Sequence, residues 1–234
     1  MRLRKLTSFL AGAVALSALA FATPSHAAQP AVDFVDALKQ NLGSFTSIGF
    51  RFQTGANAIT VDQLGVWDFG LNGLLTTHDV GIYTDGGTLL TSGTVGSGLT
   101  GSLVGQFRYV DIADIVLNPN TFYVISAQMG ANGDFFAYGE TAGVVDTLAG
   151  FTTNLGITVD PLNGGRFAFT PGDTLSFPNV NGNPFTAFLG PNFLGDEGVP
   201  PPPNNNVPEP GTIALLAASG FSGMGVAIRR RIRR

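Results

Sequence analysis

The chain contains no cysteine, which excludes disulfide bonds, thiol catalysis and thiolate metal sites. Histidine is almost as scarce, with two in the whole sequence, His26 and His78. A zinc site made of several histidines is therefore excluded by count. No G-x-S-x-G turn is present that could hold a catalytic serine. The stability of the fold must come from an apolar core.

Basic residues are scarce outside the two ends of the chain. Of 12 lysines and arginines, three lie in the first five residues and five in the last six, which leaves Lys39, Arg51, Arg108 and Arg166. Residues 28–198 thus hold four bases against 15 acids, a formal charge of −11, whereas the whole chain has −4. Such an acidic surface repels the phosphates of nucleic acids and anionic lipids, so we expect no nucleic-acid partner.

The first 27 residues have the pattern of an export signal. Three basic residues at the start are followed by an apolar stretch over 9–22, which is shorter than the ~20 residues of a membrane span. Ser25-His26-Ala27 is a small-x-small cleavage site. We predict a signal peptide over 1–27 that is cleaved after Ala27.

The C-terminal part is arranged in four blocks. A Pro/Asn-rich linker over 199–207 precedes the tripeptide Pro208-Glu209-Pro210, and the 18 residues 211–228 carry no charge. As a helix this stretch spans ~27 Å, enough for a hydrocarbon core, so we predict a transmembrane helix. Arginines beside a span hold that end in the cytoplasm. The predicted cytoplasmic anchor consists of Arg229, Arg230, Arg231, Arg233 and Arg234.

The order of tripeptide, apolar span and arginine cluster over 208–234 resembles the PEP-CTERM sorting signal. The resemblance implies an exosortase as partner, a membrane-embedded processing enzyme similar to cysteine transpeptidases, in a Gram-negative bacterium that makes exopolysaccharide. It implies that Pro208, Glu209 and Pro210 are read by that enzyme and are not catalytic here. It also implies a precursor anchored in the inner membrane, removal of the tail, and delivery to the envelope, the outer surface or the extracellular matrix.

The residues between the two signals favour strands and turns. They are rich in glycine, threonine and phenylalanine and poor in lysine and glutamate. Short runs alternate between turn signals such as Asp85-Gly86-Gly87 and Asn118-Pro119-Asn120, roughly every 8 to 12 residues. We predict a single all-β domain over 28–198, an antiparallel β-sandwich or jelly roll. The expected strands cover 47–53, 58–69, 79–83, 88–95, 107–117, 121–128, 134–138, 166–169 and 174–177.

One short helix is expected over 32–42. Val32, Val35 and Leu38 are spaced three apart, and Gly43 could end the helix.

A second resemblance supports the sandwich. It rests on the phrases GFRFQTGANAITVDQLGVWDFGLNGLLTTHDVGIYTDGGTLLTSGTV and FRYVDIADIVLNPNTFYVISAQ, between Gly49 and Gln128. This stretch is similar to a β-sandwich domain of unknown function found in many secreted bacterial proteins, whose members often carry the same kind of tag. The resemblance implies an antiparallel sandwich and no established activity.

Histidine and aspartate are the remaining candidates for chemistry. His78 shares strand parity with Val80 and Ile82, so we expect a hydrogen-bonded histidine on the core side of the sandwich rim. A pair of aspartates about 5 to 10 Å apart could hydrolyse glycosides, and loop aspartates could ligate calcium, although no D-x-D-x-D-G loop occurs. We assign no catalytic residue and no metal ligand, and calcium is the one cofactor left open. The aspartates expected at turns or on outward strand positions are Asp62, Asp68, Asp79, Asp85, Asp111, Asp114 and Asp134.

Aromatic rings raise the question of sugar binding, because exposed rings can stack on pyranose faces. Trp67 lies in an apolar strand and is expected in the core, as are the phenylalanines. Tyr83 and Tyr109 are the best candidates for exposed rings, ahead of Tyr123 and Tyr138.

These patterns indicate a non-enzymatic exported protein of the cell envelope, the exopolysaccharide matrix or a biofilm, with a structural or adhesive role. The alternatives are a carbohydrate-binding module, with or without calcium, and a glycosidase or lyase.

Overall fold

The strands of the molecule form where apolar and small side chains alternate. A computed structural model describes residues 28–35, 38–40, 46–129, 134–138, 150–160, 164–169, 174–181 and 187–198. The predicted cleavage site at Ala27, the linker, the tripeptide at 208–210, the apolar span and the arginine anchor lie outside these ranges. Within them, all regular structure is β-strand, and no helix is long and apolar enough to cross a membrane.

The larger sheet has seven strands in the described part, all paired antiparallel. The order is β15 (Val180–Asn181), β14 (Gly165–Phe169), β4 (Thr46–Gln53), β10 (Phe122–Met129), β6 (His78–Thr84) and β7 (Leu89–Val95), with β13 (Thr158–Val159) also paired to β4.

The second sheet has five antiparallel strands. The order is β1 (Gln29–Pro30), β17 (Pro191–Glu197), β5 (Ile59–Trp67), β9 (Phe107–Leu117) and β8 (Ser102–Val104). Two small sheets complete the described strands: β16 (Phe188–Leu189), β11 (Phe136–Tyr138) and β3 (Leu38–Gln40) form one, and β12 (Thr152–Thr153) and β2 (Val32–Asp33) form the other.

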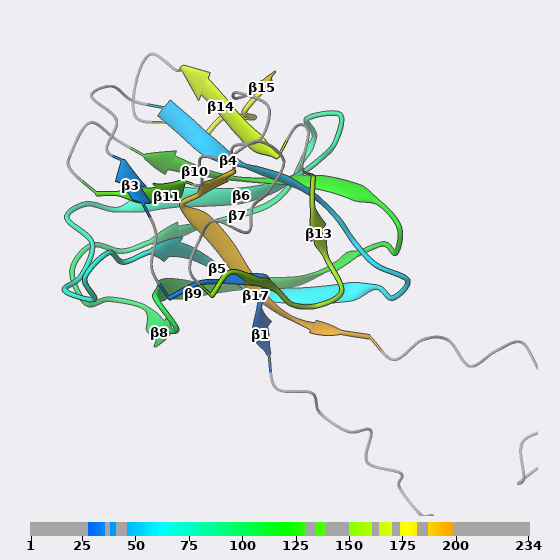
Figure 1. The fold of residues 1–234 in the computed structure, drawn as a ribbon, viewed down its shortest axis with the longest axis horizontal. Helices are drawn as coiled ribbons and strands as arrows, with labels where there is room; N and C mark the ends of the chain where they lie inside the picture. Colours follow the sequence, from blue (N-terminus) through cyan, green and yellow to red (C-terminus); the bar gives the residue numbers. More distant parts are fainter. Residues whose placement is uncertain are drawn as a thin grey trace, which may run out of the picture.

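The two large sheets face each other and enclose the core (Figure 1). Ile48, Phe50 and Phe52 alternate inward along β4, and all three are buried. The ring of Phe52 lies 5.3 Å from that of Phe193 on β17 in the opposite sheet. The prediction of an all-β antiparallel sandwich is therefore confirmed.

The hydrophobic core extends to the outward face of the five-stranded sheet. Trp67 on β5 is paired with Phe107 on β9. Leu64 and Val66 point toward the seven-stranded sheet, and Trp67 has the opposite parity along β5, so Trp67 and Phe107 point away from that sheet. Phe34 covers both, with ring centroids 5.5 Å from Trp67 and 5.4 Å from Phe107. Trp67 Nε1 donates to Gln106 Oε1 at 3.2 Å, and the Gln106 amide donates to the Phe34 carbonyl at 2.7 Å. The N-terminal segment is thus a lid over this face.

The helix predicted over 32–42 is wrong in the described part of that range, which forms β2 and β3. Asn192 on β17 binds both backbone groups of Val32, accepting from its N–H at 3.2 Å and donating to its carbonyl at 2.7 Å. β2 pairs with β12, and β3 pairs with β11. An isolated helix of this length is marginal in water, so the sheet partners decide the conformation.

The strand predicted over 174–177 is also wrong, because this segment crosses the outer face of the seven-stranded sheet without joining a ladder. Ser176 N–H donates to Ser47 Oγ at 2.9 Å, and Ser126 Oγ donates to the Ser176 carbonyl at 3.3 Å. Leu175 lies so close to Gly81 that an added Cβ there would sit 2.9 Å from it. Small residues on β4, β10 and β6 make room for this crossing segment.

The two ends of the described domain emerge at the same end of the sandwich. β1 runs antiparallel to β17, with Gln29 opposite Gly195. The N–H of Gly198 donates to the Ala58 carbonyl at 2.8 Å, just before β5 begins. Figure 1 shows β1 and the far end of β17 along one lower edge of the molecule. Whatever precedes and follows the sandwich is therefore attached on one side of it.

Candidate functional site

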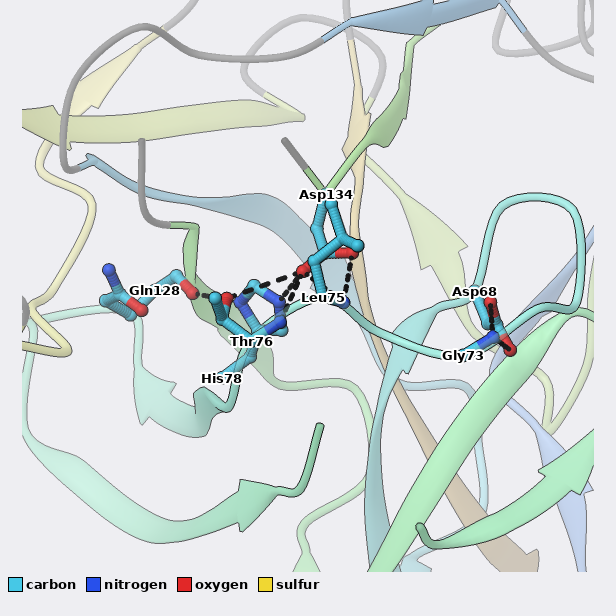
Figure 2. Close-up of polar contacts among 7 residues, drawn as sticks. All are labelled: Asp68, Gly73, Leu75, Thr76, His78, Gln128 and Asp134. Carbon is cyan, nitrogen blue, oxygen red and sulfur yellow. Dashed lines mark hydrogen bonds and ion pairs between the residues drawn. The ribbon is translucent and has the colours of Figure 1, made fainter. Parts of the chain in front are cut away.

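Several buried polar side chains surround the loop that joins β5 to β6. This loop turns sharply, with positive φ at Gly70, Leu71 and Gly73, where Leu71 has a φ of 57°. Backbone in this left-handed region is unfavourable for leucine, so the surrounding contacts must hold it. The carboxylates of Asp68 and Asp134 hold the two halves of the loop (Figure 2).

Asp68 fixes the first half of the loop. Its two carboxylate oxygens accept from the Gly73 N–H at 3.0 and 3.1 Å, and one accepts from Arg108 Nε at 2.7 Å. Arg108 also donates to the Leu99 carbonyl at 3.2 Å, which ties in the neighbouring loop. The expected outward position of Asp68 is wrong, since only 1% of the residue is exposed. The buried Arg108 explains this placement, because it neutralises the charge.

Asp134 fixes the second half of the loop. Its carboxylate accepts from the N–H groups of Leu75 at 2.9 Å and Thr76 at 3.1 Å, and it lies 2.9 Å from His78 Nε2. Burial raises the pKa of this carboxyl, but the contacts with His78 and the two amides outweigh it, so the pKa of Asp134 is lower than usual. Asp134 is therefore held in its ionised form and is not an outward, solvated aspartate as expected.

His78 uses both of its ring nitrogens. Nδ1 lies 2.9 Å from the Gln128 carbonyl and Nε2 lies 2.9 Å from Asp134. A carbonyl can only accept, so Nδ1 donates, and Nε2 faces the Asp134 carboxylate. The prediction of a buried, hydrogen-bonded histidine at the rim is confirmed. In this arrangement neither nitrogen is left to take a proton from a nucleophile or to bind a metal.

A second group of carboxylates lies around a bulge in β5. Register shifts occur on both sides of Asp62, against β9 and against β17. Burial raises the pKa of Asp62, and the charges of Asp196, Asp114 and Asp111 raise it further. In the described ranges, no group of three or more histidine, aspartate or glutamate side chains is arranged to hold a metal ion.

The outer face of the seven-stranded sheet carries a charged cluster centred on Arg51. Its guanidinium donates to both oxygens of Asp85, at 2.6 and 2.8 Å, and to Asp160 at 2.6 Å. The Phe122 ring lies 3.6 Å below it. The hydrogen bond to Arg51 lowers the pKa of Asp85 despite partial burial. The cluster closes the β6–β7 hairpin onto β4.

The tyrosines expected to be exposed are buried. Only 4% of Tyr83 and 1% of Tyr109 is exposed, and Tyr123 is buried as well. Phe177 of the crossing segment covers Tyr83, with ring centroids 5.5 Å apart, and the Tyr109 ring fills the space above Gly65. The prediction that Trp67 belongs to the core is confirmed, and the side chain of Tyr138 lies outside the described part. The described tyrosines therefore offer no platform for a sugar ring.

The fold and these contacts define a β-sandwich whose buried polar side chains stabilise its own loops. In a comparison with protein families, residues 206–231 match the family model of the PEP-CTERM protein-sorting motif. The motif indicates an exosortase-sorted extracellular protein, which confirms the prediction made from the tripeptide, the apolar span and the arginines. No significant match was found among curated proteins or among solved structures.

Proposed function

We propose that the sandwich is a structural or adhesive component of the cell envelope or of the exopolysaccharide matrix, and that it has no catalytic role. The observation that carries the proposal is the sorting motif at 206–231 on a domain in which His78, Asp68 and Asp134 are engaged in holding the β5–β6 loop. In this proposal, the protein acts through its location outside the membrane and through its contacts there, without catalysing a reaction. Its acidic sandwich suits a surface that remains hydrated.

The route is tested by following the C-terminus in cells. In an exosortase-deficient strain, intact mass should show the tail retained, and fractionation should show the protein in the inner membrane. Glu209→Ala in the wild-type strain should have the same effect. Asn204→Ala, which lies outside the matched residues, is the matched control and should be processed normally. A C-terminus and a location unchanged by loss of the exosortase would overturn the proposed route.

The role itself is tested by removing the protein. We expect a deletion strain to lose cohesion of its matrix or attachment to surfaces, with restoration by the wild-type gene and not by the Glu209→Ala variant. Turnover of the host's own polymer by the secreted protein would instead establish a glycosidase or lyase. Saturable binding to that polymer, tested with and without a calcium chelator, would establish the carbohydrate-binding alternative.

A further inference from the structure

The loop between β5 and β6 contains a dipeptide that is prone to chemical damage. Asn72 is exposed and is followed by Gly73. In such a pair the glycine nitrogen, with no side chain beside it, can attack the side-chain amide of the asparagine. The bond from Gly73 N to Asn72 Cγ forms, the Cγ–Nδ2 bond breaks, and ammonia leaves with the amide proton. Water then opens the cyclic imide to aspartate or isoaspartate.

The fold does not allow this hazard to be removed at Gly73 itself. Gly73 has a φ of 96°, which side chains rarely tolerate. A Cβ added there would lie 2.6 Å from the carbonyl carbon of Gly98 and 2.7 Å from its oxygen. Gly98 is in turn fixed by two backbone hydrogen bonds with Leu74, at 2.7 and 3.1 Å. Position 73 therefore requires glycine, and protection has to come from elsewhere.

The attacking nitrogen is held by a carboxylate. The Gly73 N–H donates to both oxygens of Asp68, at 3.0 and 3.1 Å (Figure 2). Arg108 Nε fixes this carboxylate at 2.7 Å, and both members of the ion pair are buried. The nitrogen attacks only after it loses its proton. A negative acceptor facing the N–H favours the protonated form, so the contact opposes the first step of the reaction.

We propose that Asn72 is a latent deamidation site, which the Asp68–Arg108 pair keeps closed by holding the Gly73 N–H. The pair acts by position and takes no part in a reaction. Conversion to isoaspartate would lengthen the main chain of the loop by one carbon and add a negative charge. The change would fall between the halves of the loop that Asp68 and Asp134 hold. The inference does not depend on which role the sandwich has outside the membrane.

Ageing of the purified, secreted protein tests the proposal. The protein is incubated at mildly alkaline pH, folded and in guanidinium chloride, and conversion of Asn72 is followed by peptide mapping with detection of isoaspartate. We expect conversion to be at least about tenfold slower in the folded protein, because hydrogen bonds to charged groups are strong. Equal rates in the two states would overturn the proposal. The Asn-Gly pairs at 132–133, 163–164 and 181–182 each include a residue outside the described ranges and are mapped separately.

Two variants test whether Asp68 is responsible. Asp68→Leu combined with Arg108→Met removes the acceptor and replaces the buried ion pair by apolar side chains, an exchange that is often neutral for stability. In this variant, with its fold checked by circular dichroism, conversion of Asn72 should rise by about tenfold. Asp134→Asn is the matched control, because it loosens the other half of the loop, and it should leave Asn72 as slow as in the wild type. An equal rise in both variants would assign the protection to the general order of the loop and overturn the role of Asp68.

Hydrogen exchange of the wild-type protein provides a measurement that needs no variant. At mildly alkaline pH, exchange of an amide begins with removal of the same proton that must leave before the nitrogen attacks. The Gly73 amide should therefore exchange at least about tenfold more slowly in the folded protein than in the unfolded chain. Exchange at the rate of the unfolded chain would overturn the proposal, even if the double variant did not fold.

Discussion

Asp134 is the residue on which several contacts of the β5–β6 loop converge. We expect Asp134→Asn to lower the free energy of unfolding by about 2–4 kcal/mol, because it leaves the buried His78 without its anionic partner. Urea unfolding of the secreted protein, with comparison of midpoint and slope, measures the loss. Asp114→Asn, at an exposed position, is the control and should change stability by less than about 0.5 kcal/mol.

The same substitution has a defined pH dependence. The pKa of Asp134 is lower in the folded protein than in the unfolded chain, so its contribution is complete above the unfolded value of ~3.9. It is lost as the pH falls through the lowered folded pKa. The difference between wild type and Asp134→Asn should therefore be constant from neutral pH to about pH 5, begin to fall near pH 4, and disappear only when the pH is below the lowered folded pKa of Asp134. A difference that persisted at lower pH would show that the ionised carboxylate is not responsible.

Asp62 should behave in the opposite way. Its pKa is raised by burial and by three neighbouring carboxylates, so its charged form costs stability at neutral pH. We expect Asp62→Asn to stabilise the protein at pH 7 by less than about 1 kcal/mol, since the site is partly exposed and screened. Thermal unfolding at pH 7 and near pH 4 measures the gain, which should shrink on acidification. A loss of stability at pH 7 would contradict this assignment.

Strand parity was sufficient to place His78 but not its partners. Val80 and Ile82 mark the inner face of the strand, and His78 shares their parity, so its burial follows from the sequence. Asp134 is 56 positions away, and nothing in the sequence indicates that it returns to this rim. Asp68 was expected at a turn or on an outward strand position, and its partner Arg108 comes 40 positions later in the chain, where nothing in the sequence indicates the pairing.

Among the elements, the N-terminal segment gives the clearest test. Trp67 is the one tryptophan of the chain, and Phe34 covers it. We expect Phe34→Ala to cost about 3 kcal/mol and to shift the tryptophan emission to longer wavelength, because water reaches the indole. Val35→Ala is the control at the adjacent, 73% exposed position and should change neither quantity. An unchanged emission spectrum for Phe34→Ala would show that the segment does not act as a lid.

Strands in which inward and outward residue types alternate clearly could be predicted from the sequence, and strands without this alternation could not. The range predicted over 107–117 coincides with β9. The run at 47–53 differs from β4 by one residue at its start, and the run at 121–128 differs from β10 by one residue at each end. β17 was missed, although it lies between β1 and β5, because Pro191 and Gly195 interrupt its pattern. Its Asn192 is buried by pairing with Val32, a contact between residues 160 positions apart. Long-range contacts of this kind also explain why the described residues of 32–42 form strands and not the predicted helix.

At the scale of the whole molecule, the adjacency of the two chain ends can be tested by circular permutation. Joining Gly198 to Ala28 with a short Gly/Ser linker, and opening the chain between Gly86 and Gly87, should leave the sandwich folded. Gln29 already lies opposite Gly195, so the linker spans a short gap. Far-ultraviolet circular dichroism and thermal unfolding of the secreted permutant should match the parent within a few degrees.

A permutant opened inside β5, between Leu64 and Gly65, is the control and should not fold, because that strand is paired on both sides in the five-stranded sheet. If the hairpin permutant also failed to fold, the two ends would not lie together as described. Equal success of both would mean that the five-stranded sheet does not depend on an intact central strand.

β17 is also the strand through which the attached protein would be pulled. The sorting motif follows it in the chain, so drag from moving water would enter the fold at Glu197 and act along the strand. β17 is bonded to β1 on one side and to β5 on the other. Antiparallel hydrogen bonds lie perpendicular to the strands, so a pull along β17 loads them together in shear. The bonds would then have to fail together instead of one by one, so we expect the sandwich to resist force applied along β17.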